Sequence, residues 1–407
     1  NTTANNNVAV GHESLRANTT GTNNTATGYR SLYANTSGDS NVAVGLQALR
    51  DNTTGTQNSA VGMSALEANT TGHSNTAVGK NSLRSNTGGI ENAAFGIQSM
   101  RSNTTGVENA AFGYNALRNN TTANYNTGLG ARALNTNTTG ANNLACGYNA
   151  LYSNTTASYN TAVGYYALRL NTTGYSNTAL GAEVLDANTT GYEHSASGYQ
   201  SLYSNTTGYK NVTNGYRTLF NNTTGFLNTA IGFSSMYYNT TSSENTALGS
   251  RSMFSNTTGS HNTALGVNSL YSNTTGGSCT ATGIASLYSN TTGTNNTGNG
   301  LNSLFSNTTG THNSAFGRSA LYSNQTGVYN TAIGAYALYT NPGANNNTAC
   351  GYSTLYNNTT GYDNAGLGYH ALVNNTTGLG NTAVGAEACR SNTTGGSNTG
   401  FGYRALY

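Results

Sequence analysis

The chain has 407 residues and a net charge of +3, and only 7% of its residues are charged, where about 25% is typical of soluble proteins. This composition, with 52 glycines, one proline and no tryptophan, excludes a highly charged disordered tail and the basic surface of a nucleic-acid-binding protein. No apolar run approaches the ~18 residues of a membrane-spanning helix, so we expect no membrane span.

A repeat of 17 residues runs through the whole sequence without insertion or deletion. An asparagine opens each copy, from Asn1 and Asn18 to Asn392, and 24 copies fill the chain, the last lacking only its final residue. With columns numbered 1 to 17 from that asparagine, the consensus is N-T-T-G-x-x-N-T-A-φ-G-x-x-[AS]-L-[YR]-[SAN], where φ is apolar. The sequence opens directly on a copy, which suggests a mature product or an excerpt of a longer chain.

The period itself predicts the fold class. Seventeen residues are too few for a two-helix repeat of ~33 residues, and asparagine, threonine and glycine disfavour helix. Each copy holds two strand-like runs, of the types "NTAV" and "ALYS", and no single copy can bury a core alone. We therefore predict that residues 1–407 form one continuous all-β parallel β-solenoid, with two short strands per 17-residue coil. At ~4.8 Å per coil, 24 coils would make a rod of roughly 115 Å.

Column 1 is asparagine in all 24 copies. Stacked asparagine side chains can bond one another and the nearby backbone, so we predict an amide ladder. Its representative members are Asn18, Asn35 and Asn52. The same column opens an N-x-T or N-x-S glycosylation sequon in 22 copies, which is the alternative interpretation. The corresponding candidate acceptors are Asn18, Asn52, Asn69 and Asn103. Asparagine persists at Asn86 and Asn341, where the sequon is lost, and this favours the ladder.

Columns 2 and 3 are threonine in most copies, and Pro342 occupies column 2 once. Because proline has no N–H, this column is expected to lie in a turn and to donate no backbone hydrogen bond to a neighbouring coil. Regular threonine columns on a β-solenoid also resemble ice-binding surfaces, which leaves ice binding as one alternative function.

Columns 8 to 11 are expected to form the first strand and its corner. Column 10 is apolar in most copies and is predicted to face the core, with column 8 on the same side. Column 9 holds only alanine, glycine or Thr213, which indicates close approach of another backbone. Column 11 is always glycine, as in Gly28, Gly45 and Gly62, and this predicts a corner with positive φ.

Columns 15 and 16 are expected to divide between core and surface. Column 15 is leucine in 20 copies, including Leu32, Leu49 and Leu66, and never polar, so it should be buried. Column 16 alternates between tyrosine and arginine and can either pack across coils or bind a partner such as a glycan or matrix component. The candidate partner-binding residues are Tyr271, Tyr288, Tyr322, Tyr339 and Tyr356.

Residues that carry chemistry do not converge in the predicted coils. The six histidines fall in five columns, and the four cysteines are too far apart along one solenoid to pair. Cys146, Cys279, Cys350 and Cys389 are therefore interpreted as single substitutions at buried columns. We expect no enzyme activity, no metal and no cofactor.

The repeat resembles the YadA-like head repeat of trimeric autotransporter adhesins, and similar strings occur in phage tail fibres. The matching segments are "NVAVGLQAL", from Asn41 to Leu49, and "NSAVGMSAL", from Asn58 to Leu66. The resemblance implies a left-handed parallel β-roll with three chains side by side, acting as a surface stalk or adhesive head. The 17-residue copy is longer than that family's repeat, as if "NTT" expanded one turn.

These observations predict an extracellular structural fibre or adhesin shaft, on a cell surface or a virion. The expected partners are further copies of the same chain, in a homotrimer or in an end-to-end filament. Neither terminal copy carries the polar cap that solenoids normally need, so we expect either that flanking domains are missing or that the rods join end to end. An adhesive head that binds glycan or matrix through the tyrosine and arginine ladders is the alternative from a different class, beside ice binding.

Overall fold

The structure, a computed structural model, describes residues 3–407, so that Asn1 lies outside the described residues. Each copy forms one coil of a parallel β-solenoid and contributes one three-residue strand from columns 8 to 10. The predicted all-β solenoid is thus confirmed, with 24 strands and no helix in the described part of the chain. The chain divides into two compact units, Asn1–Thr207 and Gly208–Tyr407.

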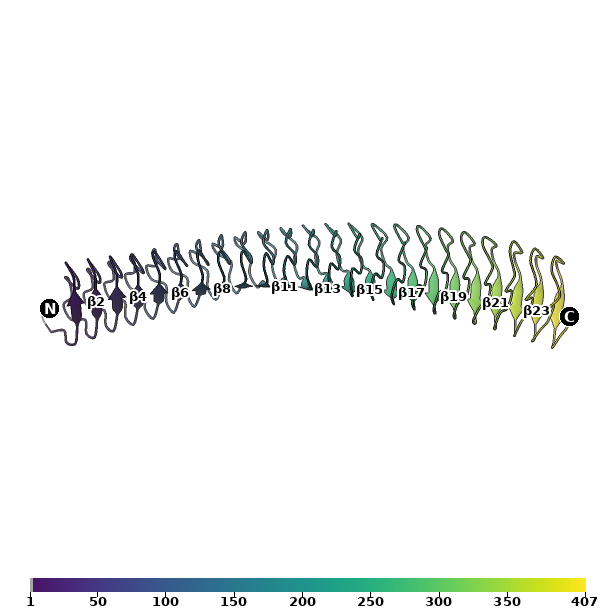
Figure 1. Ribbon diagram of the computed structural model, residues 1–407, viewed down its shortest axis with the longest axis horizontal. Helices are drawn as coiled ribbons and strands as arrows, with labels where there is room; N and C mark the ends of the chain where they lie inside the picture. The colour runs from purple at the N-terminus through teal and green to yellow at the C-terminus, as the bar shows by residue number, and fades with distance from the viewer. Residues whose placement is uncertain (1–2) are drawn as a thin grey trace. The chain divides into compact units, whose positions relative to one another are not determined.

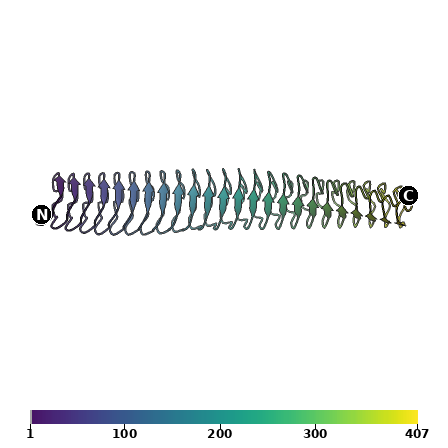
Figure 2. The same ribbon diagram turned by 90° about the horizontal axis from the view of Figure 1, so that it is seen from below.

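In each unit, consecutive strands pair in parallel and in register, one repeat apart. Val42 lies opposite Ser59, and Val44 lies opposite Val61. Within each unit the coils follow one another in chain order (Figure 1), and the turned view shows the strands of each unit as a row (Figure 2). The first unit holds β1 (Val8–Val10), β2 (Thr25–Thr27), β3 (Val42–Val44), β4 (Ser59–Val61), β5 (Thr76–Val78), β6 (Ala93–Phe95), β7 (Ala110–Phe112), β8 (Thr127–Leu129), β9 (Leu144–Cys146), β10 (Thr161–Val163), β11 (Thr178–Leu180) and β12 (Ser195–Ser197). The second holds β13 (Val212–Asn214), β14 (Thr229–Ile231), β15 (Thr246–Leu248), β16 (Thr263–Leu265), β17 (Thr280–Thr282), β18 (Thr297–Asn299), β19 (Ser314–Phe316), β20 (Thr331–Ile333), β21 (Thr348–Cys350), β22 (Ala365–Leu367), β23 (Thr382–Val384) and β24 (Thr399–Phe401).

The second strand predicted for each coil is absent. The "ALYS" run is a turn, because the residue in column 15 has a left-handed backbone with φ between 47° and 54°. Columns 6 and 13 also have positive φ, so that each coil turns sharply at three places besides its glycine corner. An extended strand cannot pass through a left-handed residue, and one strand per coil remains.

The predicted orientation of the strand is wrong. Column 9 points into the coil, where Ala26, Ala43 and Ala60 have no exposed surface, whereas columns 8 and 10 point outward. The interior is narrow: a side-chain carbon added to Gly128 in column 9 would lie 3.4 Å from both the Ala133 backbone carbonyl oxygen and the Leu117 side chain. Only alanine, glycine or one threonine fits there, so the close approach inferred for column 9 is correct.

The glycine corner of column 11 is confirmed. These glycines have φ between 104° and 140°, including Gly28, Gly45 and Gly62. A side-chain carbon added to Gly45 would lie 2.7 Å from the carbonyl oxygen of Gly62 in the next coil. Both the backbone conformation and the contact between coils therefore require glycine. Column 15 is buried as predicted, and Leu32, Leu49 and Leu66 have no exposed surface.

Candidate functional site

The amide ladder predicted for column 1 is present. Asn35 Nδ2 donates to Asn18 Oδ1 at 2.8 Å and to the Gly38 carbonyl of its own coil at 3.0 Å. Its own Oδ1 accepts from Asn52 Nδ2 at 2.8 Å. Each asparagine therefore closes its turn and joins two neighbouring coils. Aspartate could not donate these bonds, and a stack of carboxylates would repel.

The same geometry bears on the proposed glycosylation. The four candidate acceptors, Asn18, Asn52, Asn69 and Asn103, are at most 2% exposed. In Asn52, Asn69 and Asn103 both amide hydrogens are donated inside the protein. A glycan on this nitrogen would replace one of these bonds and would need space that the coil does not have, so the folded chain does not offer these residues for modification.

A second amide ladder in column 7 was not predicted. Asn58 Nδ2 donates to Asn41 Oδ1 at 3.2 Å and to the Gly72 carbonyl at 2.9 Å, and the Asn58 backbone N–H donates to Asn41 Oδ1 at 3.0 Å. The signal in the sequence was the near-constant asparagine of this column. Its bonds tie the strand side of one coil to the turn of the next.

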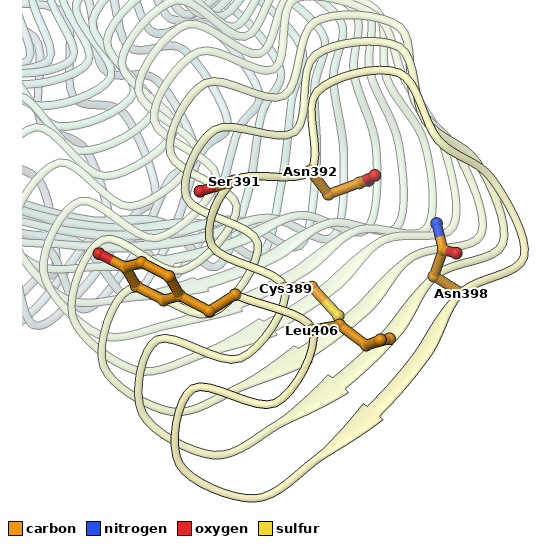
Figure 3. Close-up of a pocket in the computed structure, with 6 residues that line it drawn as sticks. Cys389, Ser391, Asn392, Asn398 and Leu406 are labelled. Atoms are coloured by element: carbon orange, nitrogen blue, oxygen red, sulfur yellow. The ribbon is translucent and has the colours of Figure 1, made fainter.

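Figure 3 shows one residue of each ladder, Asn392 and Asn398, in the copy 392–407. Asn392 from column 1 and Asn398 from column 7 point toward each other across the coil, beside Cys389 and Leu406 from column 15 of two successive coils, and Leu406 is 60% exposed. These side chains line a pocket of about 240 Å³. In coils within each unit the equivalent asparagines and leucines lie buried under the next coil.

The threonines of column 2 form a third ladder. Thr36 donates its backbone N–H and its hydroxyl to the Thr53 carbonyl of the next coil, both at 3.0 Å. The expectation that column 2 donates no backbone hydrogen bond is therefore wrong. Threonine in this column donates its N–H to the next coil, and Pro342 is an exception because it has no N–H. The column 2 hydroxyls of most coils are thus occupied within the protein, whereas the threonines of column 3 are exposed.

The predicted partner-binding tyrosines belong to a stack of nine rings in column 16. Ring centroids of adjacent members lie 4.9 to 5.5 Å apart, and the rings are nearly parallel. The members are Phe220, Tyr237, Phe254, Tyr271, Tyr288, Phe305, Tyr322, Tyr339 and Tyr356. Each inner ring has neighbours on both faces, so ligands meet only ring edges and hydroxyls. Partial burial also raises the pKa of Tyr339.

Acidic residues interrupt column 16 in the first unit and pair with arginines of adjacent coils. Glu67 contacts Arg50 through one carboxylate oxygen, and the other carboxylate oxygen of Glu67 lies 2.7 Å from Arg84 Nε. Arg169 binds Asp186 through two bonds of 2.8 Å. Burial raises the pKa of Asp186, and Arg169 opposes this shift. Column 16 thus contains ion pairs in the first unit and a continuous stack of rings from Phe220 to Tyr356 in the second.

The outward side of the strands, which we call the strand face, consists of columns 8 and 10. Column 10 is apolar in most copies, and neither column contains a charged residue. Phe95 and Phe112 stack at 4.9 Å on this face and remain 36% and 41% exposed, and Ile231 is 40% exposed. Cys146 and Cys350 also lie here and are half-buried, not core residues as predicted.

The cysteines are free thiols, and Cys279 replaces asparagine in column 7. Its thiol lies 3.4 Å from the Gly293 carbonyl, and burial raises its pKa to about 11. Because this folded-state pKa lies above the ordinary pKa of a thiol, near 9.0, the thiol's contribution to stability is intact below pH 9 and is lost as the pH rises toward 11.

We expect the free energy of unfolding of the wild type to fall by about 2 kcal/mol more than that of a Cys279→Asn variant between pH 8 and 11. Urea unfolding of both proteins across this range measures the difference. A Cys350→Ser variant, altered on the strand face, controls for loss of a thiol. Equal pH dependence in wild type and Cys279→Asn would contradict the shifted pKa.

No known protein-family model matches the chain, and no curated protein resembles it at a significant level. Among residues 3–407, no group of three or more histidine, cysteine, aspartate or glutamate residues is placed to hold a metal ion. The described residues also include no helix with the length and apolarity to cross a membrane.

Proposed function

We propose that the chain is the shaft of an extracellular structural fibre, a stiff rod that associates side by side with copies of itself. Its role is structural and not catalytic, because its recurrent polar groups are committed to bonds between coils. The observation that carries the proposal is the strand face, which contains no charged residue and has an apolar side chain in column 10 in 19 of the 24 copies.

Parallel sheets are normally covered on both faces. Here the inner face of the sheet packs against the other wall of the coil, whereas the strand face exposes large side chains such as Val44, Phe95 and Phe316. A partner that covers this face must carry apolar side chains at the same ~4.8 Å spacing. A second copy of the chain has the same spacing because it has the same coils. The three-chain arrangement implied by the resemblance would place the strand faces together.

Analytical ultracentrifugation tests this association. We expect the wild type to sediment as an oligomer, and the double variant Phe95→Lys, Phe112→Lys to dissociate with a constant raised about a hundredfold or more, because two ammonium groups would enter an apolar interface. The matched control is Thr105→Lys, Thr122→Lys on the exposed column 3. A monomeric wild type, or equal effects of both pairs, would refute association through the strand face.

The location, the adhesin role and the end-to-end filament remain parts of this proposal. Negative-stain electron microscopy of the intact chain measures rod length, the number of chains and any contacts between ends. Long filaments in axial register support a structural fibre, whereas discrete short rods support a shaft or head.

A further inference from the structure

A cleft in the second unit departs from the regular pattern of the coils. It has a volume of about 350 Å³ and lies in the copies that contain β13, β14 and β15. Tyr216 and Phe233 of column 12 stack at 5.3 Å on one side, and Tyr237 and Phe254 of column 16 stack at 5.5 Å on the other. The floor between them is Ser234 in column 13.

Ser234 creates the cleft because its neighbours in column 13 are long. Arg217 precedes it by one coil and Arg251 follows it by one coil, so the two arginine backbones lie about 10 Å apart. Ser234 is only 5% exposed, yet its hydroxyl has no hydrogen-bond partner among the described residues. A nearly buried hydroxyl that opens into a cleft between two guanidinium groups is suited to a polar, anionic ligand.

Two arginines, Arg217 and Arg251, line the cleft. Glu244 is the one carboxylate in residues 208–255, and it lies in column 6, where it contacts His261 at 3.3 Å. Within the described residues no carboxylate pairs with Arg251, which is exposed and lies 5.9 Å from the centre of the Phe233 ring. The guanidinium of Arg251 is thus available to bind a carboxylate through two hydrogen bonds.

Tyr238 supplies a flat apolar surface at the same place. It is the one aromatic residue in column 17, and it is 48% exposed. Its ring stands nearly perpendicular to the rings of Tyr237 and Phe254, at interplanar angles of 81° and 86°. It therefore lies outside the column-16 stack, and its ring is not covered by stacked neighbours on both faces as the inner rings of that stack are. The C–H side of a sugar ring packs well on such a face.

We propose that this cleft binds an acidic saccharide, with the sugar ring on Tyr238, its carboxylate on Arg251, and a hydroxyl group on Ser234. Aromatic rings alone would suit a neutral sugar, and arginines alone would suit any anion. The combination around a nearly buried hydroxyl favours a sugar that carries a carboxylate.

Isothermal titration of the full chain with a galacturonic acid tetramer tests the proposal, with a neutral galactose tetramer and inorganic sulfate as comparison probes. We expect the acidic tetramer to bind at least about tenfold more tightly than either comparison probe. Equal binding of the neutral tetramer, equal binding of sulfate, or no binding of the acidic tetramer would overturn the proposal.

Three variants use residues that the same columns already contain, so that folding is preserved. Arg251→Gln introduces a residue found in column 13 at Gln47 and Gln98, and Ser234→Tyr introduces one found in that column at Tyr166. Tyr238→Ser introduces serine, which is common in column 17. We expect Ser234→Tyr to abolish binding, and the other two to weaken it about tenfold.

The matched control for the filled cleft is Ser319→Tyr, the same substitution at the same column in another coil of this unit. It should bind the acidic tetramer as the wild type does. If Ser234→Tyr binds normally, or if Ser319→Tyr loses binding equally, the site is not this cleft. These titrations are independent of the oligomeric state, so their failure is distinguishable from failure of the proposed side-by-side association.

Discussion

An Asn307→Ala variant is expected to lose about 3–5 kcal/mol of unfolding free energy through a single truncated side chain. Asn307 Nδ2 donates to Asn290 Oδ1 at 2.7 Å and to the Gly310 carbonyl at 3.1 Å, and its Oδ1 accepts from Asn324 at 2.8 Å. The substitution removes three bonds and leaves buried partners in three places, each costing about 1–3 kcal/mol when unsatisfied.

Urea unfolding of the full chain and native-state hydrogen exchange measure this effect. Because a solenoid coil contacts only its neighbours, exchange should increase most at the backbone amides of Thr308 and Thr291, which donate between adjacent coils. The control is Thr309→Ala in the exposed column 3 of the same coil, which should change stability by less than about 0.5 kcal/mol. If both variants unfold alike, the amide ladder does not stabilise the solenoid.

The second large effect is expected from Leu304→Ile, a change that keeps the number of atoms. Leu304 is fully buried and has φ of 50°. A side chain branched at Cβ clashes with the backbone in this left-handed conformation, so we expect a loss of about 3 kcal/mol. Leucine-to-isoleucine changes in ordinary cores usually cost less than about 1.5 kcal/mol.

Leu304→Met is the matched comparison, because methionine already occupies column 15 at Met100, Met236 and Met253. It is unbranched at Cβ and should cost less than about 1.5 kcal/mol. Thermal and urea unfolding of the two variants separate backbone strain from loss of packing. Equal destabilisation by isoleucine and methionine would show that the left-handed backbone at column 15 is not what selects its residues.

The period, the single coil per copy, the glycine corner and the column-1 ladder could all be predicted from the sequence. Each rests on a column whose identity never varies, as at Gly45 and Asn35, and an invariant residue type points directly to a backbone or hydrogen-bonding requirement. The left-handed positions also left a signal: columns 6, 13 and 15 contain no valine, isoleucine or threonine in a chain rich in threonine.

The direction of the strand could not be predicted in the same way. Alternation shows that columns 8 and 10 share a side, but it does not show which side is inside. Apolar residues such as Val44 and Phe112 led to the prediction that column 10 faces the core, because that prediction assumes that one chain buries its own apolar surface. The coil interior instead admits only alanine-sized side chains in column 9, and the larger residues remain on the strand face.

The cleft at Ser234 could not be predicted from the sequence either. Its parts lie in columns 12, 13, 16 and 17 of three copies, and none is unusual within its own column except Tyr238. Only the stacking of coils brings a short residue, two arginines and a perpendicular ring together.

The hydrogen bonds from one asparagine side chain to another in columns 1 and 7 both run toward the preceding coil, as from Asn35 to Asn18 and from Asn58 to Asn41, whereas the threonine hydroxyls of column 2 donate to the following coil. Each coil therefore has two unlike sides, and only a neighbour in the same orientation matches them. Tandem duplication of a gene segment always yields that orientation. Gain or loss of whole repeats by unequal recombination can thus lengthen or shorten the protein while every junction stays chemically the same.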